Sequence, residues 1–246
     1  MNAAIDACEL GVRFYFDRQR RPVTPALAGL RRRVSESWGL RDLSFSIGPG
    51  ESVALIGPSG AGKTTLLRSL AGIFVPDAGR LEVRGRVASL LSIDAGLLPR
   101  LTGRENCLLL AVLGGLSRAE ARAAVARVKE RSGLAEAFDR PVSSFSQGMS
   151  ARLGYAVAEQ TRPQVLLLDE VHEALDHEFR AIVEETAQKI VGSGGIVVAA
   201  GHDHPLLEQL CGRALLLRGG KVAADGAFLD VRAAYFAEAE MDGRAE

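Results

Sequence analysis

Three stretches of this chain are almost entirely apolar and end abruptly in polar or glycine-containing sequence. They are Ser52–Ile56, Val165–Leu168 and Ile196–Ala200. A continuous apolar run of this length is typical of a parallel strand that is covered on both faces. Because polar residues follow each run, we expect the carboxyl ends of these strands to share one edge of an open α/β sheet, where such sheets bind ligands. Arg213–Leu217 and Lys221–Ala224, joined through Gly219-Gly220, predict a late hairpin.

The segment between these strands has a helical pattern. Thr102-Gly103-Arg104-Glu105 and Ser117-Arg118-Ala119-Glu120 have the spacing of a capping box, so each is expected to start a helix, and the second helix should end before Gly133. A third helix is expected from about Gln147 to Gln160. We therefore predict a helical subdomain over residues 94–160.

A glycine-rich loop directly follows the first apolar strand. Gly57-Pro58-Ser59-Gly60-Ala61-Gly62-Lys63-Thr64-Thr65 matches the P-loop pattern G-x-x-x-x-G-K-[ST]. Small residues let successive backbone N–H groups point at phosphate oxygens, and the dipole of a helix that begins near Lys63 favours the same anion. Lys63 adds a positive charge for the outer phosphates, and the Thr64 hydroxyl is suited to bind Mg²⁺. The loop predicts nucleotide binding.

Four further patterns follow the loop in a fixed order. Phe145-Ser146-Gln147-Gly148-Met149 stands directly before the third helix, and Val165-Leu166-Leu167-Leu168-Asp169-Glu170 is an apolar strand that ends in two carboxylates, a Walker B motif. Asp169 is expected to hold Mg²⁺, and Glu170 to orient or deprotonate the attacking water. Ala174-Leu175-Asp176 comes shortly afterwards, and His202 follows the strand that ends at Ala200.

This set resembles the nucleotide-binding subunit of ABC transporters over roughly residues 5–230. The resemblance implies an α/β fold, a P-loop NTPase core with a mostly parallel central sheet, antiparallel β elements and an inserted helical subdomain. It implies that Ser146-Gln147-Gly148 is the signature motif, Asp176 the D-loop aspartate and His202 the switch histidine that contacts the γ-phosphate. It further implies a homodimer with two ATP molecules at the interface, because the signature motif of one chain faces the P-loop of the other.

The signature departs from the usual Leu-Ser-Gly-Gly-Gln form, since Gln147 and Met149 replace a glycine and a glutamine. Together with Thr102-Gly103-Arg104-Glu105-Asn106 and an extra segment over residues 22–40, it resembles ATPases that export polysaccharides and polyol-phosphate polymers. We expect the motor subunit of such an exporter, working with separate transmembrane permease subunits. Another cargo, such as a drug, peptide or lipid, and a soluble ABC ATPase outside transport are the open alternatives.

Two positions of the expected site are ambiguous. The family's Q-loop glutamine should fall near Ser92 or Ile93, neither of which can coordinate Mg²⁺ as glutamine does, and Asp94 is a candidate substitute. Tyr15 is the candidate for stacking on adenine, with Phe14 and Phe16 as rivals. An aromatic residue in an early strand is as often part of the core.

Charge and hydropathy limit the classes of binding partner and the cellular location that we expect. The 246 residues carry a formal net charge of zero, so no global field recruits nucleic acid. The longest strongly apolar segment, Cys107–Leu116, is about ten residues, against roughly 20 for a membrane-spanning helix. We expect a peripheral protein on the cytoplasmic side of the membrane. Residues 30–38 fit a short basic amphipathic helix, which either touches lipid weakly or is a solvated connection with Trp38 tucked down.

The expected organisation is a single ABC ATP-binding domain over residues 1–246. Residues 1–93 and 161–246 form its ATP-binding core, and residues 94–160 form the helical signature subdomain. The segment 22–40 is an insertion.

Overall fold

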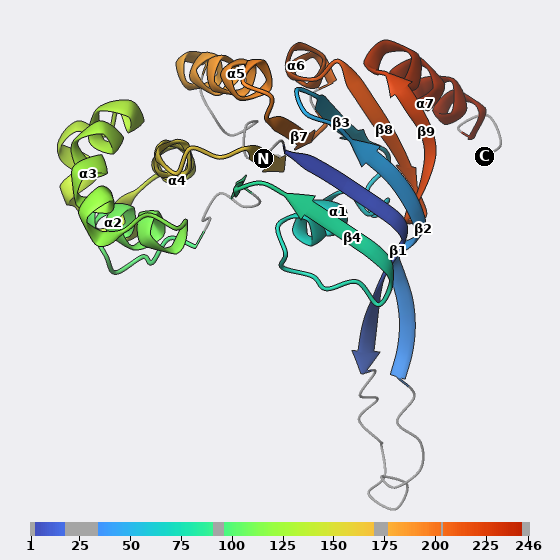
Figure 1. The fold of residues 1–246 in the computed structure, drawn as a ribbon, viewed down its shortest axis with the longest axis horizontal. Coiled ribbons are helices and arrows are strands. Elements are labelled where there is room, and N and C mark those ends of the chain that lie inside the picture. Colours follow the sequence, from blue (N-terminus) through green and yellow to red (C-terminus); the bar gives the residue numbers. More distant parts are fainter. Residues whose placement is uncertain (1–2, 18–33, 91–95, 170–176, 203, 243–246) are drawn as a thin grey trace, which may run out of the picture.

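Two β-sheets form the centre of the protein, and helices surround them (Figure 1). The computed structural model describes residues 3–17, 34–90, 96–169, 177–202 and 204–242. The larger sheet has the strand order β5-β6-β7-β3-β8-β9 and is parallel except for the pairing of β8 with β9. Its strands are β3 (Ser52–Ile56), β5 (Val87–Leu90), β6 (Val165–Asp169), β7 (Ile196–Ala200), β8 (Arg213–Arg218) and β9 (Lys221–Ala227). The three predicted buried strands and the late hairpin are confirmed.

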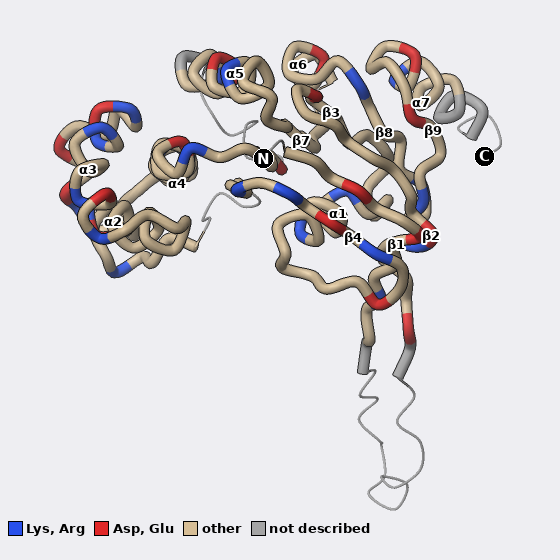
Figure 2. The backbone as a smooth tube through the Cα atoms, viewed as in Figure 1, with Lys and Arg blue, Asp and Glu red and all other residues tan. Residues whose placement is uncertain are grey.

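A smaller antiparallel sheet has the order β2-β1-β4. Its strands are β1 (Ala4–Asp17), β2 (Val34–Ile47) and β4 (Ala78–Arg84). Arg80, Glu82 and Arg84 alternate in charge along β4, while the central strands β3 and β7 carry no charged residue (Figure 2). The mostly parallel sheet, the antiparallel elements and the helices together confirm the expected fold class.

Seven α-helices are described, and the four whose starts were predicted begin where the sequence placed them. They are α1 (Lys63–Leu70), α2 (Gly103–Leu113), α3 (Arg118–Ser132), α4 (Gln147–Gln160), α5 (His177–Gly192), α6 (His204–Leu210) and α7 (Phe228–Asp242). Gly133, at the end of α3, has a left-handed backbone with a φ of 65°, as a helix terminator does.

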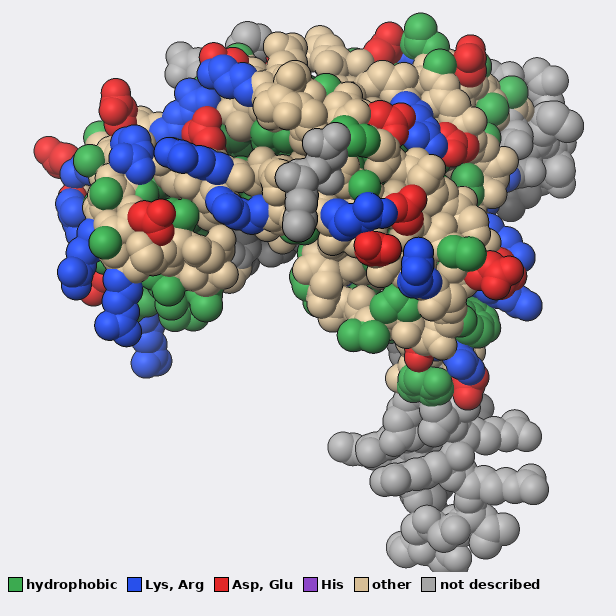
Figure 3. Space-filling view, viewed as in Figure 1, with side chains coloured by type: hydrophobic (Ala, Val, Ile, Leu, Met, Phe, Trp, Pro, Cys, Tyr) green, Lys and Arg blue, Asp and Glu red, His purple; other side chains and the backbone are tan. Residues whose placement is uncertain are grey.

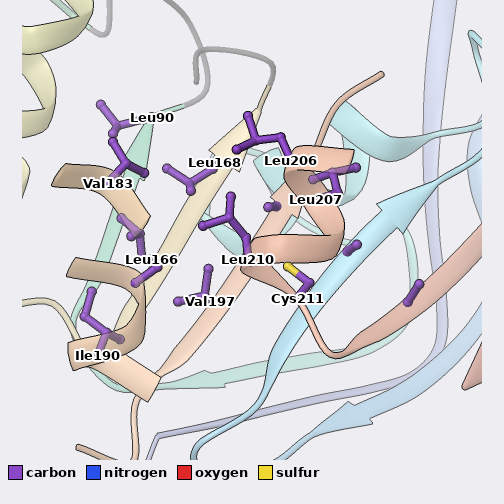
Figure 4. Packing of buried hydrophobic residues seen from close by; sticks show 14 of the residues in the cluster. Leu90, Leu166, Leu168, Val183, Ile190, Val197, Leu206, Leu207, Leu210 and Cys211 are labelled. Carbon is purple, nitrogen blue, oxygen red and sulfur yellow. The ribbon is translucent and has the colours of Figure 1, made fainter. Parts of the chain in front are cut away.

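The central strands β3, β6 and β7 are apolar, apart from Ser52 at the start of β3 and Asp169 at the end of β6, because both of their faces are buried. Val53 and Leu55 point into one hydrophobic cluster with α1 and the small sheet, whereas Ala54 and Ile56 point into a second. The second cluster lies under α5, α6 and α7. Figure 4 shows part of it, with Leu166, Leu168, Val183, Ile190, Leu206, Leu207 and Leu210.

The helices α2, α3 and α4 surround a third cluster of their own, with Cys107, Val128 and Phe138 at its centre. One face of α4 contributes Leu153 and Ala156 to this cluster, while Ala151 and Tyr155 on its other face belong to the cluster under α5. Thus α4 joins the helical region to the sheet. The division into residues 1–93 with 161–246 and residues 94–160 stays a prediction.

The amphipathic helix expected at residues 30–38 is wrong wherever the structure describes that segment. Residues 34–38 belong to β2, where Glu36 pairs with Tyr15 and Trp38 with Arg13. A helix of nine residues is marginal by itself, and the ladder with the long strand β1 outweighs it. Trp38 is also 37% exposed and not tucked down. Residues 22–33 of the expected insertion lie outside the described residues.

Over the described ranges, every helix is too short or too polar to span a lipid bilayer. Figure 3 shows acidic and basic side chains mixed over one face of the protein, with many Lys and Arg side chains over the α2–α4 end.

Candidate functional site

The loop after β3 has a backbone that only glycine adopts without strain. Gly57, Gly60 and Gly62 have φ values of 143°, 77° and 108°. A Cβ on Gly57 would lie 2.2 Å from the carbonyl oxygen of Leu217, and one on Gly62 would lie 2.8 Å from that of Gly39. These glycines let the loop fold tightly against its neighbours before α1 begins.

The start of α1 is open. Its N-cap is Gly62, which has no side chain to bond to the first N–H groups, and the first turn contains no acidic residue. The Lys63 side chain is buried, and its Nζ donates to the carbonyl oxygens of Gly57 at 2.6 Å and of Pro58 at 3.2 Å. Backbone N–H groups, a helix dipole and an ammonium group therefore gather at one point, as an anion site requires.

The sheet register brings Asp169 and His202 to the same edge as this loop. Leu55 of β3 and Asp169 of β6 both pair with Ala200 of β7, and His202 follows two residues later. Asp169 is 6% exposed. His202 lines a hollow of about 350 Å³ with residues 59–65 of the loop. The structure therefore brings the P-loop and His202 together, beside a strand end that carries a buried carboxylate.

The donor groups at this edge fit a magnesium ion. Mg²⁺ takes oxygen ligands and is usually bound by one or two carboxylates together with substrate phosphates. Thr64 supplies a hydroxyl in the second position of α1, and Asp169 supplies a carboxylate at the end of β6. No group of three or more His, Cys, Asp and Glu residues suited to a metal ion occurs in the described part of the chain.

Two aromatic residues, Phe14 and Trp38, line the same hollow. Tyr15 is 56% exposed and is not among the lining residues. It follows Phe14 in β1, and successive side chains of a strand point to opposite faces. Phe14 packs edge-on against Phe74, with the ring centroids 5.5 Å apart. Sequence reasoning treated Phe14 only as a rival and missed Trp38, because it read that segment as a helix.

The signature residues lie elsewhere. Ser146 is the N-cap of α4, and its Oγ accepts a hydrogen bond from the Met149 N–H at 3.2 Å. Ser146 and Gln147 are exposed, and Gly148 is half-buried. None of the three is among the residues that line the P-loop hollow.

Glu170, Asp176, and the Q-loop candidates Ser92, Ile93 and Asp94 lie outside the described residues, as does the side chain of Phe16.

Comparisons with known proteins agree with this geometry. The sequence model of the ABC transporter family matches residues 40–173. The O-antigen export system ATP-binding protein RfbB of Klebsiella pneumoniae is 38% identical over 187 residues, 76% of each chain. The corresponding RfbE protein of Yersinia enterocolitica is 36% identical over 80% of this chain and 82% of its own length. The teichoic acids export ATP-binding protein TagH of Lactococcus lactis subsp. lactis is 33% identical over 79% of this chain and 42% of its own.

Solved structures share the fold. A dimeric ATP-binding cassette in a post-hydrolysis state, bound to ADP and Pi, superposes with a TM-score of 0.74 at 20% identity and covers 91% of this chain and 98% of its own. The ATP-binding subunit of an ABC transporter gives 0.73 at 23% identity, over 94% and 92% of the two chains.

Proposed function

The chain belongs to the ABC transporter family, and we propose that it is the ATP-hydrolysing motor subunit of an exporter for a cell-surface polysaccharide or a similar lipid-linked polymer. One observation carries the proposal: the open start of α1 lies at the sheet edge that also holds Asp169 and His202. The cargo is supported by the names of the O-antigen and teichoic acid export relatives and by the signature form around Gln147 and Met149.

In this proposal, the loop from Gly57 to Thr65 binds the triphosphate with its backbone N–H groups and with the Lys63 ammonium. The Thr64 hydroxyl and the Asp169 carboxylate would hold Mg²⁺, which supplies positive charge to the outer phosphates when bound. His202, which lines the same hollow as the loop, contacts the γ-phosphate. Glu170 follows Asp169 in the chain and orients or deprotonates the attacking water. Phe14 and Trp38 replace Tyr15 as our candidates for contact with the adenine.

The exposed tip of α4 gives the reason for a homodimer. Ser146 ends in a hydroxyl, and the start of α4 contains no acidic residue that would repel a phosphate. Since this tip is not part of the P-loop hollow of its own chain, we propose that it closes over the ATP held by a second copy, with Asp176 at the same interface. Two ATP molecules then lie between two chains.

A second hollow, next to the start of α4, suits contact with a transmembrane permease. Leu97, Pro99, Val142, Phe145 and Gln147 are among the residues that line it. The loop beside it is held rigidly by the buried Asn106, whose amide donates to the carbonyl oxygens of Leu98, Leu101 and Thr102. We propose that this surface passes the movement of the helical region to the permease, which places the protein at the cytoplasmic side of the membrane.

Replacement of Glu170 by Gln tests the proposal. General acid–base assistance contributes about 10²–10⁴ in rate, so Glu170→Gln should lower ATP turnover by that order. ATP binding, measured by titration with a fluorescent ATP analogue, should be retained because the P-loop is intact. Lys63→Met is the matched control and should weaken binding itself. Wild-type turnover by Glu170→Gln would remove Glu170 from this role.

A second experiment tests the cargo. The permease is purified together with its motor subunit, and ATPase activity is measured with and without the polymer. Stimulation by a different cargo alone would contradict polymer export.

A further inference from the structure

An aromatic cluster lies two residues along the chain from His202, around the side chain of His204. The ring of His204, the first residue of α6, lies 5.6 Å from the ring of Tyr235 and 5.2 Å from that of Phe236, both on α7. Tyr235 and Phe236 are themselves 5.3 Å apart at an angle of 61°. The three rings therefore form one contact group, with the imidazole held by two aromatic side chains of the last helix.

The backbone connects this cluster to the nucleotide hollow. The N–H of His204 donates to the carbonyl oxygen of His202 at 3.1 Å. His202 lines the hollow with the P-loop, whereas the His204 ring points to α7. The residue whose ring contacts α7 is therefore joined by a backbone hydrogen bond to the residue that lines the hollow.

The helix α7 is anchored to the sheet and to α6, so it can hold the two rings in a fixed position. Phe228 and Val231 at its start are buried in the cluster under the sheet, and the Phe228 N–H donates to the carbonyl oxygen of Gly212 at 3.1 Å. Arg232 forms an ion pair with Glu208 of α6, which links the two helices. Both helices cover the same face of the larger sheet (Figure 1). Phe236 remains 49% exposed. Because half of its side chain is exposed, burial of apolar surface does not explain a phenylalanine at this position. The contact of its ring with His204 does explain it.

We propose that Tyr235 and Phe236 are positioning residues for the ATPase reaction, which hold the His204 ring and thereby fix His202 toward the γ-phosphate. This inference rests on the role proposed above for His202. A displacement of about 1 Å in a group that acts on the transition state lowers a rate by up to about 10²-fold. Loss of one of two rings should have a smaller effect, on the order of tenfold.

The experiment compares Phe236→Ala with Leu229→Ala in the full chain. Leu229 is an exposed apolar residue of the same helix, 52% exposed, and serves as the matched control. For Phe236→Ala we expect kcat to fall by on the order of tenfold with the KM for ATP within about twofold, because the P-loop is unchanged. Leu229→Ala should behave as wild type, and Phe236→Tyr, which keeps the ring, should restore kcat.

Two further readouts separate positioning from a general loss of structure. Combined with His202→Ala, the Phe236→Ala change should have no further effect on the residual rate, because both act through one group. Amide exchange at His204, which reports its bond to the His202 carbonyl, should be at least tenfold faster in Phe236→Ala than in Leu229→Ala. Exchange and kcat unchanged by Phe236→Ala, or an additional rate loss beside His202→Ala, would overturn the inference while leaving the proposed function intact. Wild-type turnover by His202→Ala would instead overturn the role of His202, and the inference with it.

Discussion

The N-termini of α2 and α3 are closed by capping side chains, whereas that of α1 is not, and this difference matches the function we propose for each N-terminus. In α2, the Thr102 Oγ1 accepts from the Glu105 N–H at 3.2 Å, and the Glu105 carboxylate accepts from the Thr102 N–H at 2.8 Å. Ser117 and Glu120 make the same pair of bonds at the start of α3. Helix α1 begins at Gly62 with neither a capping side chain nor an acidic residue.

A capping box satisfies two N–H groups within the chain and adds a negative charge that suits the helix dipole. Both features would compete with a phosphate. The start of α1 lacks both, so its N–H groups stay available to an anion. The start of α4 is intermediate, because Ser146 caps Met149 but no carboxylate follows. Among α1 to α4, the two starts without a carboxylate are thus the two that we expect to contact ATP, whereas α2 and α3 have starts that only stabilise the helix.

The largest expected effect comes from closing the start of α1 sterically. In Gly62→Ala, the new Cβ would lie 2.8 Å from a backbone oxygen at a φ of 108°. Backbone strain of about 1–3 kcal/mol and overpacking of about 1–3 kcal/mol together predict a loss of roughly 2–6 kcal/mol in the free energy of unfolding. ATP binding should be lost as well. Urea unfolding and nucleotide titration measure the two effects.

Gly60→Ala is the control in the same loop. Its φ is 77°, but nothing lies within 4 Å of the added Cβ, so only the left-handed backbone costs free energy, about 1–2 kcal/mol. If Gly62→Ala and Gly60→Ala lost the same free energy of unfolding and the same ATP affinity, the close contacts of Gly62 with its neighbours would not determine the conformation of the loop.

The features predicted correctly from the sequence depend on interactions between residues close together in the chain. The features that were missed depend on contacts between distant segments. The starts of α2 and α3 were predicted to the residue, and that of α4 closely, because a capping side chain acts within three positions. The strand at residues 34–38 was missed because its partner β1 is distant along the chain. The pocket aromatics were uncertain for the same reason. Register shifts on both sides of Val12 decide which face of the β1–β2 ribbon each side chain takes, and no short sequence window shows them.

A smaller effect distinguishes a structural cap from one that also serves the reaction. Thr102→Ala and Ser146→Ala each remove an N-cap oxygen, so each should lower the free energy of unfolding by about 1 kcal/mol. Only Ser146→Ala should lower ATP turnover, by roughly tenfold or more, because a hydrogen bond to a charged group contributes about 1.5–3 kcal/mol. Matched stability with divergent kcat is the expected result. Equal kcat in both variants would place α4 with α2 and α3 as a helix whose start is only structural.

The smallest expected effect concerns pH. Hydrogen bonds from Thr102 hold the pKa of Glu105 below its ordinary value of 4.5, and bonds from Ser117 do the same for Glu120. Because both folded-state pKa values are depressed, the stabilisation is present above pH 4.5 and is lost as the pH falls through the folded values. The first turn of α1 has no carboxylate to titrate.

Wild type should therefore have a higher free energy of unfolding than the variant Glu105→Gln/Glu120→Gln near pH 6, and this difference should shrink toward pH 3. The variant keeps Asp139, whose pKa is lowered to about 2 by Arg104 and Lys129, so the comparison isolates the two capping boxes. A stability difference that stays constant between pH 6 and pH 3 would show that the carboxylate charges contribute nothing to these helix starts, and that α1 differs from α2 and α3 only in its hydrogen bonds.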